Sequence, residues 1–170
     1  MILLLVEAIC TKKRWLFYIL IGILFGVFDF YFLNFVTPWS TQFSWFNEIV
    51  GFVLTFGVWL LPSIPILIYE KKSSPSLILP TFANCLTWCI SVIIYYLTNM
   101  VQLVVGSSTQ PYLSIAHYQS PDFWTNWSNV LVTYIVGHIL EWIIFAVISS
   151  LVIGILFHVI DLLVVRKPPS

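Results

Sequence analysis

Asp29, His138 and Glu141 are ionisable side chains that lie far from the cytoplasmic ends of long apolar stretches of the chain. Ionisable groups in hydrocarbon are costly, and by default they point to a functional site. Asp29 is expected about 20 Å from the inner membrane boundary, and His138 and Glu141 at a similar depth, or at the outer interface if the fourth span is shifted inward. A carboxylate beside an imidazole can share one proton, which suits a proton relay or a cation site. The alternative is a buried hydrogen-bonded pair that fixes the helix register.

Other chemistry finds less support in the residue pattern. His138 and Glu141 have the i, i+3 spacing of metal ligands on a bundle helix, but the further Glu and His residues of such sites are missing. His138 and His158 share one helix and lie about 30 Å apart, so they cannot ligate one haem. Cys85 and Cys89 are expected to pack as free thiols. The sequence predicts no cofactor and no metal, and bound lipid or pigment is compatible with its aromatic content.

The composition excludes a soluble domain. Of the 170 residues, 60% are hydrophobic and 8% are charged, against about a quarter charged in ordinary soluble proteins. Seven basic residues balance seven acidic ones without a basic stripe, which excludes nucleic acid as a partner. The chain is therefore predicted to be an all-α integral membrane protein.

Four apolar runs are long enough to cross a bilayer, at about residues 15–36, 49–69, 77–105 and 130–165. Every basic residue lies outside them, in three groups: Lys12, Lys13 and Arg14; Lys71 and Lys72; Arg166 and Lys167. The positive-inside rule then places both termini in the cytoplasm, so we expect a multi-pass protein of the plasma or inner membrane. Residues 1–14 are expected to form an interfacial arm, and residues 1–170 a single compact four-helix bundle.

Small and polar residues at helical spacing predict which helix faces meet other helices. The set expected to pack comprises Gly22 and Gly26 on the first span, Asn84, Ser91, Tyr95 and Gln102 on the third, and Ser150 and Gly154 on the fourth. Thr55 and Trp59 share a face of the second span. Pro62 and Pro65 should bend or end that span near the cytoplasm.

The outer connections are rich in aromatic residues, which suit the headgroup zone of a membrane. With no sizeable soluble loop and two polar patches on the fourth span, we expect a small non-enzymatic subunit that packs with other membrane subunits or with itself, and with lipid. The first alternative is a small oligomeric transporter or channel for a proton or cation, using Asp29, His138 and Glu141. An intramembrane enzyme acting on lipid is a third class, without a recognisable nucleophile–base or metal set.

Overall fold

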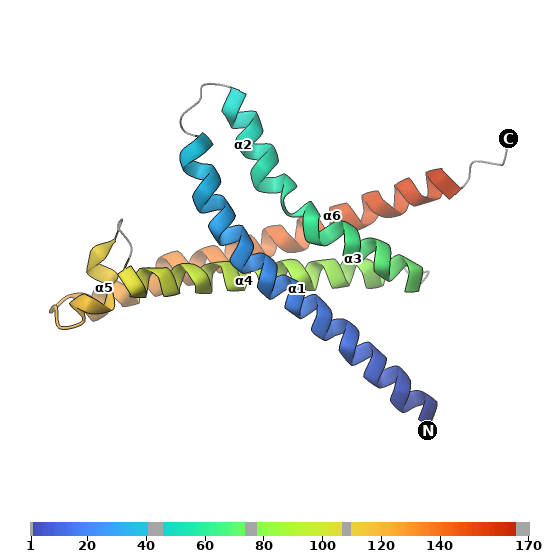
Figure 1. Ribbon diagram of the computed structural model, residues 1–170, viewed down its shortest axis with the longest axis horizontal. Helices are drawn as coiled ribbons and strands as arrows, with labels where there is room; N and C mark the ends of the chain where they lie inside the picture. Colours follow the sequence, from blue (N-terminus) through green and yellow to red (C-terminus); the bar gives the residue numbers. More distant parts are fainter. Residues whose placement is uncertain (1, 41–45, 74–77, 107–109, 166–170) are drawn as a thin grey trace.

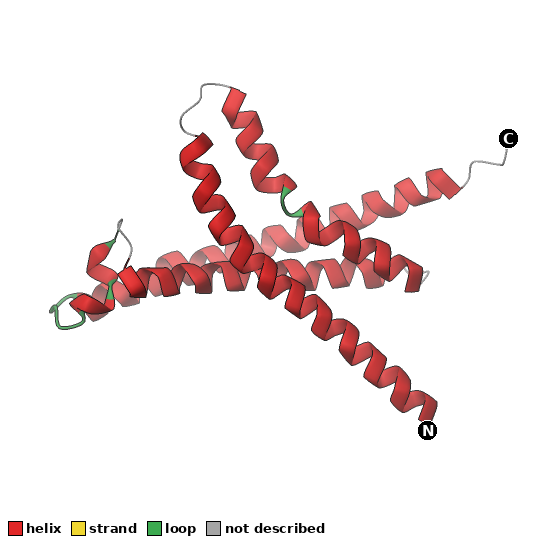
Figure 2. Cartoon of the chain, viewed as in Figure 1, coloured by secondary structure: helices red, strands yellow, loops and turns green. Residues whose placement is uncertain are grey.

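The computed structural model describes residues 2–40, 46–73, 78–106 and 110–165, and these are helical apart from short turns (Figures 1 and 2). Within them, four helical stretches are long and apolar enough to cross a membrane: Lys13–Val36, Ile49–Glu70, Ile78–Gly106 and Phe123–Ile160. The predicted all-helical, multi-pass class is therefore confirmed. The compact bundle and the sides on which the termini lie stay predictions.

The first crossing belongs to α1 (Ile2–Ser40), a single helix of 39 residues. Residues 2–14, expected to form a separate arm, continue the same helix without a break. The third crossing is α4 (Ile78–Gly106), and the fourth ends in α6 (Gly137–Val165).

The second crossing is broken into α2 (Phe46–Gly57) and α3 (Leu60–Ser73). Pro62 lies in the first turn of α3. Its ring has no N–H and would clash with the carbonyl four residues earlier, that of Val58, so the α-helical ladder cannot continue there. That carbonyl instead accepts a tighter bond from the backbone N–H of Leu61, at 3.0 Å. The break thus falls near the middle of the span Ile49–Glu70, and the prediction of a bend at its cytoplasmic end was wrong.

Between α4 and α6 the chain forms a short folded segment at one end of the molecule (Figure 1). It contains the 3₁₀ turns η1 (Pro111–Leu113) and η2 (Ile115–His117), then α5 (Phe123–Asn129). The indole N–H of Trp127 donates to the carbonyl of Leu113 at 2.8 Å, and both Leu113 and Phe123 are buried. A π-helix, η3 (Val130–Val136), joins this segment to α6.

Helix α4 is the centre of the packing: α1 crosses it, α6 runs along it, and α3 packs beside it (Figure 1). Gly22 and Gly26 allow the close approach of α1, because a Cβ atom at either position would collide with the backbone of α4. The hydroxyl of Ser91 donates to the carbonyl of Gly22 at 3.1 Å across this contact. On the other side of α4, Gly154 of α6 lies against Thr81.

The remaining residues of the predicted packing set differ in burial. Ser150 and Asn84 are fully buried, and the side-chain amide of Asn84 has no hydrogen-bond partner among the described residues. Tyr95 is half-buried, whereas Gln102 is exposed. Seven of the eight residues are therefore at least partly covered within the single chain.

Candidate functional site

Asp29 of α1 is buried in the middle of the molecule. Its side chain is 2% exposed, although it is a carboxylate, and its Oδ1 atom has no hydrogen-bond partner among the residues that the structure describes. Buried polar groups are nearly always paired, and an unpaired one in a native structure requires an explanation. A ligand or ion that reaches this oxygen would provide one.

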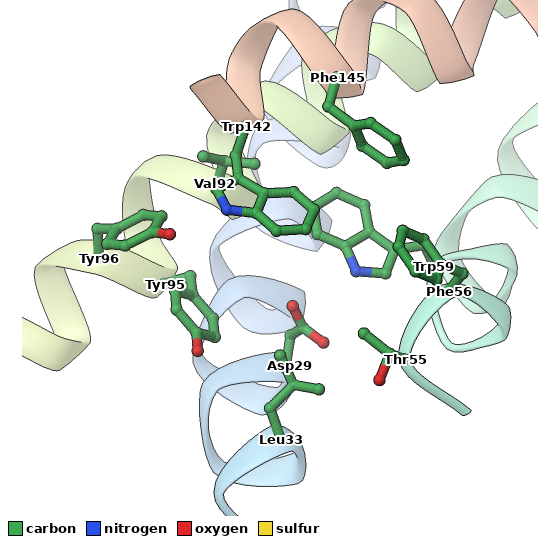
Figure 3. A pocket seen from close by; sticks show the side chains of 10 residues that line it. All are labelled: Asp29, Leu33, Thr55, Phe56, Trp59, Val92, Tyr95, Tyr96, Trp142 and Phe145. Carbon is green, nitrogen blue, oxygen red and sulfur yellow. The ribbon is translucent and has the colours of Figure 1, made fainter. Parts of the chain in front are cut away.

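The carboxylate borders a partly open cavity of about 80 Å³. Helices α1, α4 and α6 and the end of α2 with the α2–α3 break contribute its ten lining residues: Asp29, Leu33, Thr55, Phe56, Trp59, Val92, Tyr95, Tyr96, Trp142 and Phe145. Six of these ten are aromatic. In Figure 3 the carboxylate lies between Tyr95 and Thr55 and points to the side on which Trp59 and Trp142 lie. One acidic group therefore stands in an otherwise mostly aromatic chamber.

The break in the second crossing positions one wall of this cavity. Trp59 follows the last turn of α2, where its ring packs edge-on against Trp88 of α4, with 5.0 Å between ring centroids. The hydroxyl of Ser63 donates to the carbonyl of Trp59 at 2.7 Å and accepts the indole N–H of Trp88 at 2.8 Å. Phe25 of α1 packs against Trp59 from the other side. The irregular backbone is thus held in place by both neighbouring helices.

His138 and Glu141 do not line the cavity with Asp29. His138 is half-buried, and its Nδ1 lies 2.7 Å from the carbonyl oxygen of Tyr134 in η3. Its ring packs on Tyr96, with 6.1 Å between centroids, and Tyr96 is itself a lining residue. Glu141 is exposed on the surface of the single chain. Of the three predicted site residues, the structure brings only Asp29 into the cavity.

Asp29 and His138 nevertheless lie at the same level along α4, and Glu141 follows His138 by about one helical turn. Gly154 lies against Thr81, and His138 lies against Tyr96, so α4 and α6 run antiparallel in a fixed register. Phe30, the neighbour of Asp29, packs against Tyr95 of α4. The contacts of His138 with Tyr96 and of Phe30 with Tyr95 both fall close to the centre of the α4 span, Ile78–Gly106.

A second buried polar cluster joins the predicted cytoplasmic ends of α1 and α3. Glu70 is 1% exposed, and its carboxylate accepts hydrogen bonds from the Arg14 guanidinium and the Tyr18 hydroxyl. This cluster was not predicted from the sequence. The signal in the sequence was that Glu70 and Arg14, which carry opposite charges, lie at those ends of the second and first apolar runs that are predicted to be cytoplasmic.

The cavity walls were also mostly missed. The shared face of Thr55 and Trp59 was visible as helical spacing, but Trp142 and Phe145 lie among apolar neighbours with no periodic signal. Cys85 and Cys89 are free and half-buried. In the part of the chain that the structure describes, no three His, Cys, Asp or Glu side chains gather closely enough to hold a metal ion.

No protein-family model, curated protein or solved structure matches this chain. Function must therefore be argued from the site itself.

Proposed function

We propose that this protein is a small membrane subunit that assembles with other transmembrane helices, from partner subunits or from further copies of itself. The observation that carries this proposal is the position of Glu141. It is exposed on the single chain, near the middle of the long apolar stretch Phe123–Ile160. Charged side chains inside a membrane almost always face protein or a water-filled cavity, and a helix from outside the chain would supply the protein partner for Glu141.

The packing of α6 supports the same conclusion. Its main contacts with another crossing are with α4, and they use the face that carries Ser150 and Gly154. The face that carries Glu141 and Tyr134 is left exposed. A second helix placed there would give the carboxylate a hydrogen-bond or ionic partner, at about 0.6 to 2 kcal/mol for each polar contact in a membrane.

The test compares the size of the complex extracted from the protein's own membrane with the size of the complex formed by a variant. We expect the full chain, solubilised in a mild detergent and run on a native gel, to migrate as a complex larger than a monomer. Glu141→Leu should shift it towards the monomer, because the polar contact is lost. Thr133→Leu is the matched control, since Thr133 is also exposed on the fourth crossing. A monomer in the unsubstituted protein would refute the proposal.

A second candidate is a transporter or channel for a proton or cation, and a different observation favours it. The unpaired Oδ1 of Asp29 faces a cavity at a broken helix, and transporters place broken helices at their binding sites. If Asp29→Asn leaves proton and cation flux unchanged in reconstituted vesicles, this candidate fails. Glu141→Gln, measured in the same assay, tests whether the exposed carboxylate takes part.

A further inference from the structure

We propose that the Asp29 cavity binds a small organic cation, an alkylammonium group held by one carboxylate and a cage of aromatic rings. This names the ligand class of the transport candidate and rests on the same cavity. It requires neither movement of the ligand across the membrane nor assembly with other subunits, so binding can be measured separately from both.

The charge of the site calls for a cation. None of the described residues that line the cavity is basic. Arg14 of α1 is paired with Glu70. It lies about 22 Å from Asp29 along the helix axis, at 1.5 Å per residue. A buried carboxyl group without a counter-charge holds a proton, and a ligand that supplies a positive charge competes with that proton for Asp29. A ligand that carries one positive charge would compensate Asp29.

The cage selects the kind of cation. The face of an aromatic ring attracts ammonium groups, most strongly for Trp, and quaternary ammonium ligands are commonly bound by several such rings. Trp59 and Trp142 belong to different crossings, and Phe56, Phe145, Tyr95 and Tyr96 are the other aromatic residues that line the cavity. Each ring in contact with a desolvated ammonium should tighten binding by about 2- to 30-fold.

A divalent metal ion fits the same lining poorly. Calcium needs six to eight oxygen ligands, and magnesium needs near-octahedral oxygen geometry with retained water. The lining side chains offer the Asp29 carboxylate, the Thr55 hydroxyl and the hydroxyls of Tyr95 and Tyr96. An alkylammonium ion carries its own apolar surface and needs no such shell. The volume of about 80 Å³ favours a compact head group.

The experiment uses the purified full chain in nanodiscs of phosphatidylglycerol, which contain no choline. Choline is titrated by calorimetry, with tryptophan fluorescence as a second readout because Trp59 and Trp142 line the cavity. Its uncharged isostere, 3,3-dimethyl-1-butanol, is the matched ligand control. We expect saturable binding of choline, at least about tenfold weaker binding of the alcohol, and no competition from equimolar sodium.

Three variants separate the roles of charge and ring. Asp29→Asn keeps the shape of the side chain and should weaken choline binding by about tenfold or more. Trp142→Leu should weaken it by about 2- to 30-fold. Trp124→Leu is the control, since Trp124 is 71% exposed and lies outside the cavity lining. It should bind choline like the unsubstituted protein.

Unchanged affinity in Asp29→Asn, equal binding of choline and the alcohol, or no saturable binding by helical protein would each overturn the proposal. Repeating the titration in phosphatidylcholine nanodiscs identifies the source of the ammonium group. Weaker apparent binding of choline there supports a lipid head group as the natural ligand, and equal binding supports a free solute. Binding without flux would refute transport only, and a monomer that binds choline would refute the subunit proposal only.

Discussion

Replacing Gly26 by alanine should destabilise the protein, because α1 and α4 meet backbone to backbone at this residue. A Cβ atom at Gly26 would lie 2.5 Å from the carbonyl oxygen of Ser91 and 2.8 Å from Cβ of Ile94. Neither neighbour is the far end of a flexible side chain, so the two helices must move apart. Such a shift would also stretch the bond from the Ser91 hydroxyl to the carbonyl of Gly22, now 3.1 Å.

The magnitude follows from two opposing effects. Forcing one extra carbon into a close-packed contact costs about 1 to 3 kcal/mol, and the two contacts below 3.0 Å place Gly26 at the upper end. Alanine favours a helix over glycine by about 1 kcal/mol. The net loss in the free energy of unfolding for Gly26→Ala is therefore about 2 kcal/mol. Gly22→Ala, with its nearest contact at 2.8 Å, should lose about 1 kcal/mol.

The assay is reversible unfolding in mixed detergent micelles, followed by tryptophan fluorescence. Gly137→Ala is the control, because a Cβ there meets nothing closer than 3.8 Å and the residue begins the regular helix α6. Its stability should equal or exceed that of the unsubstituted protein. If Gly26→Ala is as stable as Gly137→Ala, the close approach of α1 and α4 described above is wrong.

Three further substitutions test the other buried contacts. Glu70→Gln removes the charge that engages Arg14 and should lower the free energy of unfolding by about 2 to 4 kcal/mol, measured in the same micelles. Ser63→Ala leaves the buried indole N–H of Trp88 without its acceptor and should cost about 1 to 2 kcal/mol by the same measurement. Trp127→Phe removes the bond from the indole to η1 and should increase amide hydrogen exchange in residues 110–122 while leaving α4 protected.

Each of these has a control on the same chain. Lys72→Gln is the control for Glu70→Gln, and Ser128→Ala is the control for Ser63→Ala, since Lys72 and Ser128 are exposed. Both should leave the free energy of unfolding within about 0.5 kcal/mol of that of the unsubstituted protein. Trp124→Phe should leave hydrogen exchange in 110–122 unchanged, because Trp124 is largely exposed. A loss for Ser63→Ala no larger than for Ser128→Ala would show that the Trp88 bond is not formed.

The helical class and the approximate spans could be predicted from the sequence because they depend on local composition and length alone. A run of about 20 apolar residues must be helical in a bilayer, whatever its neighbours are. The position of the helix break was also encoded locally. A proline acts on the carbonyl four residues before it, so Pro62 marks Val58 and not its own position.

The site could be predicted only in part, because it depends on which helices become neighbours. The cost of burying a carboxylate identified Asp29 from the sequence. Nothing local distinguishes Trp142, which faces the cavity, from Ile144, which is 62% exposed. Glu70 and Arg14 are 56 positions apart, and their pairing requires the ends of α1 and α3 to meet.

The broken second crossing divides its attachments between two neighbours. Of its two pieces, α2 packs chiefly on α1, whereas α3 packs chiefly on α4 and is also bound to α1 through Glu70. Between the pieces, the regular α-helical ladder is interrupted at Val58 and Trp59. A tilt of α2 about this break would therefore widen or narrow the cavity beside Thr55 and Phe56, while α3 keeps its contacts with α4 and α1.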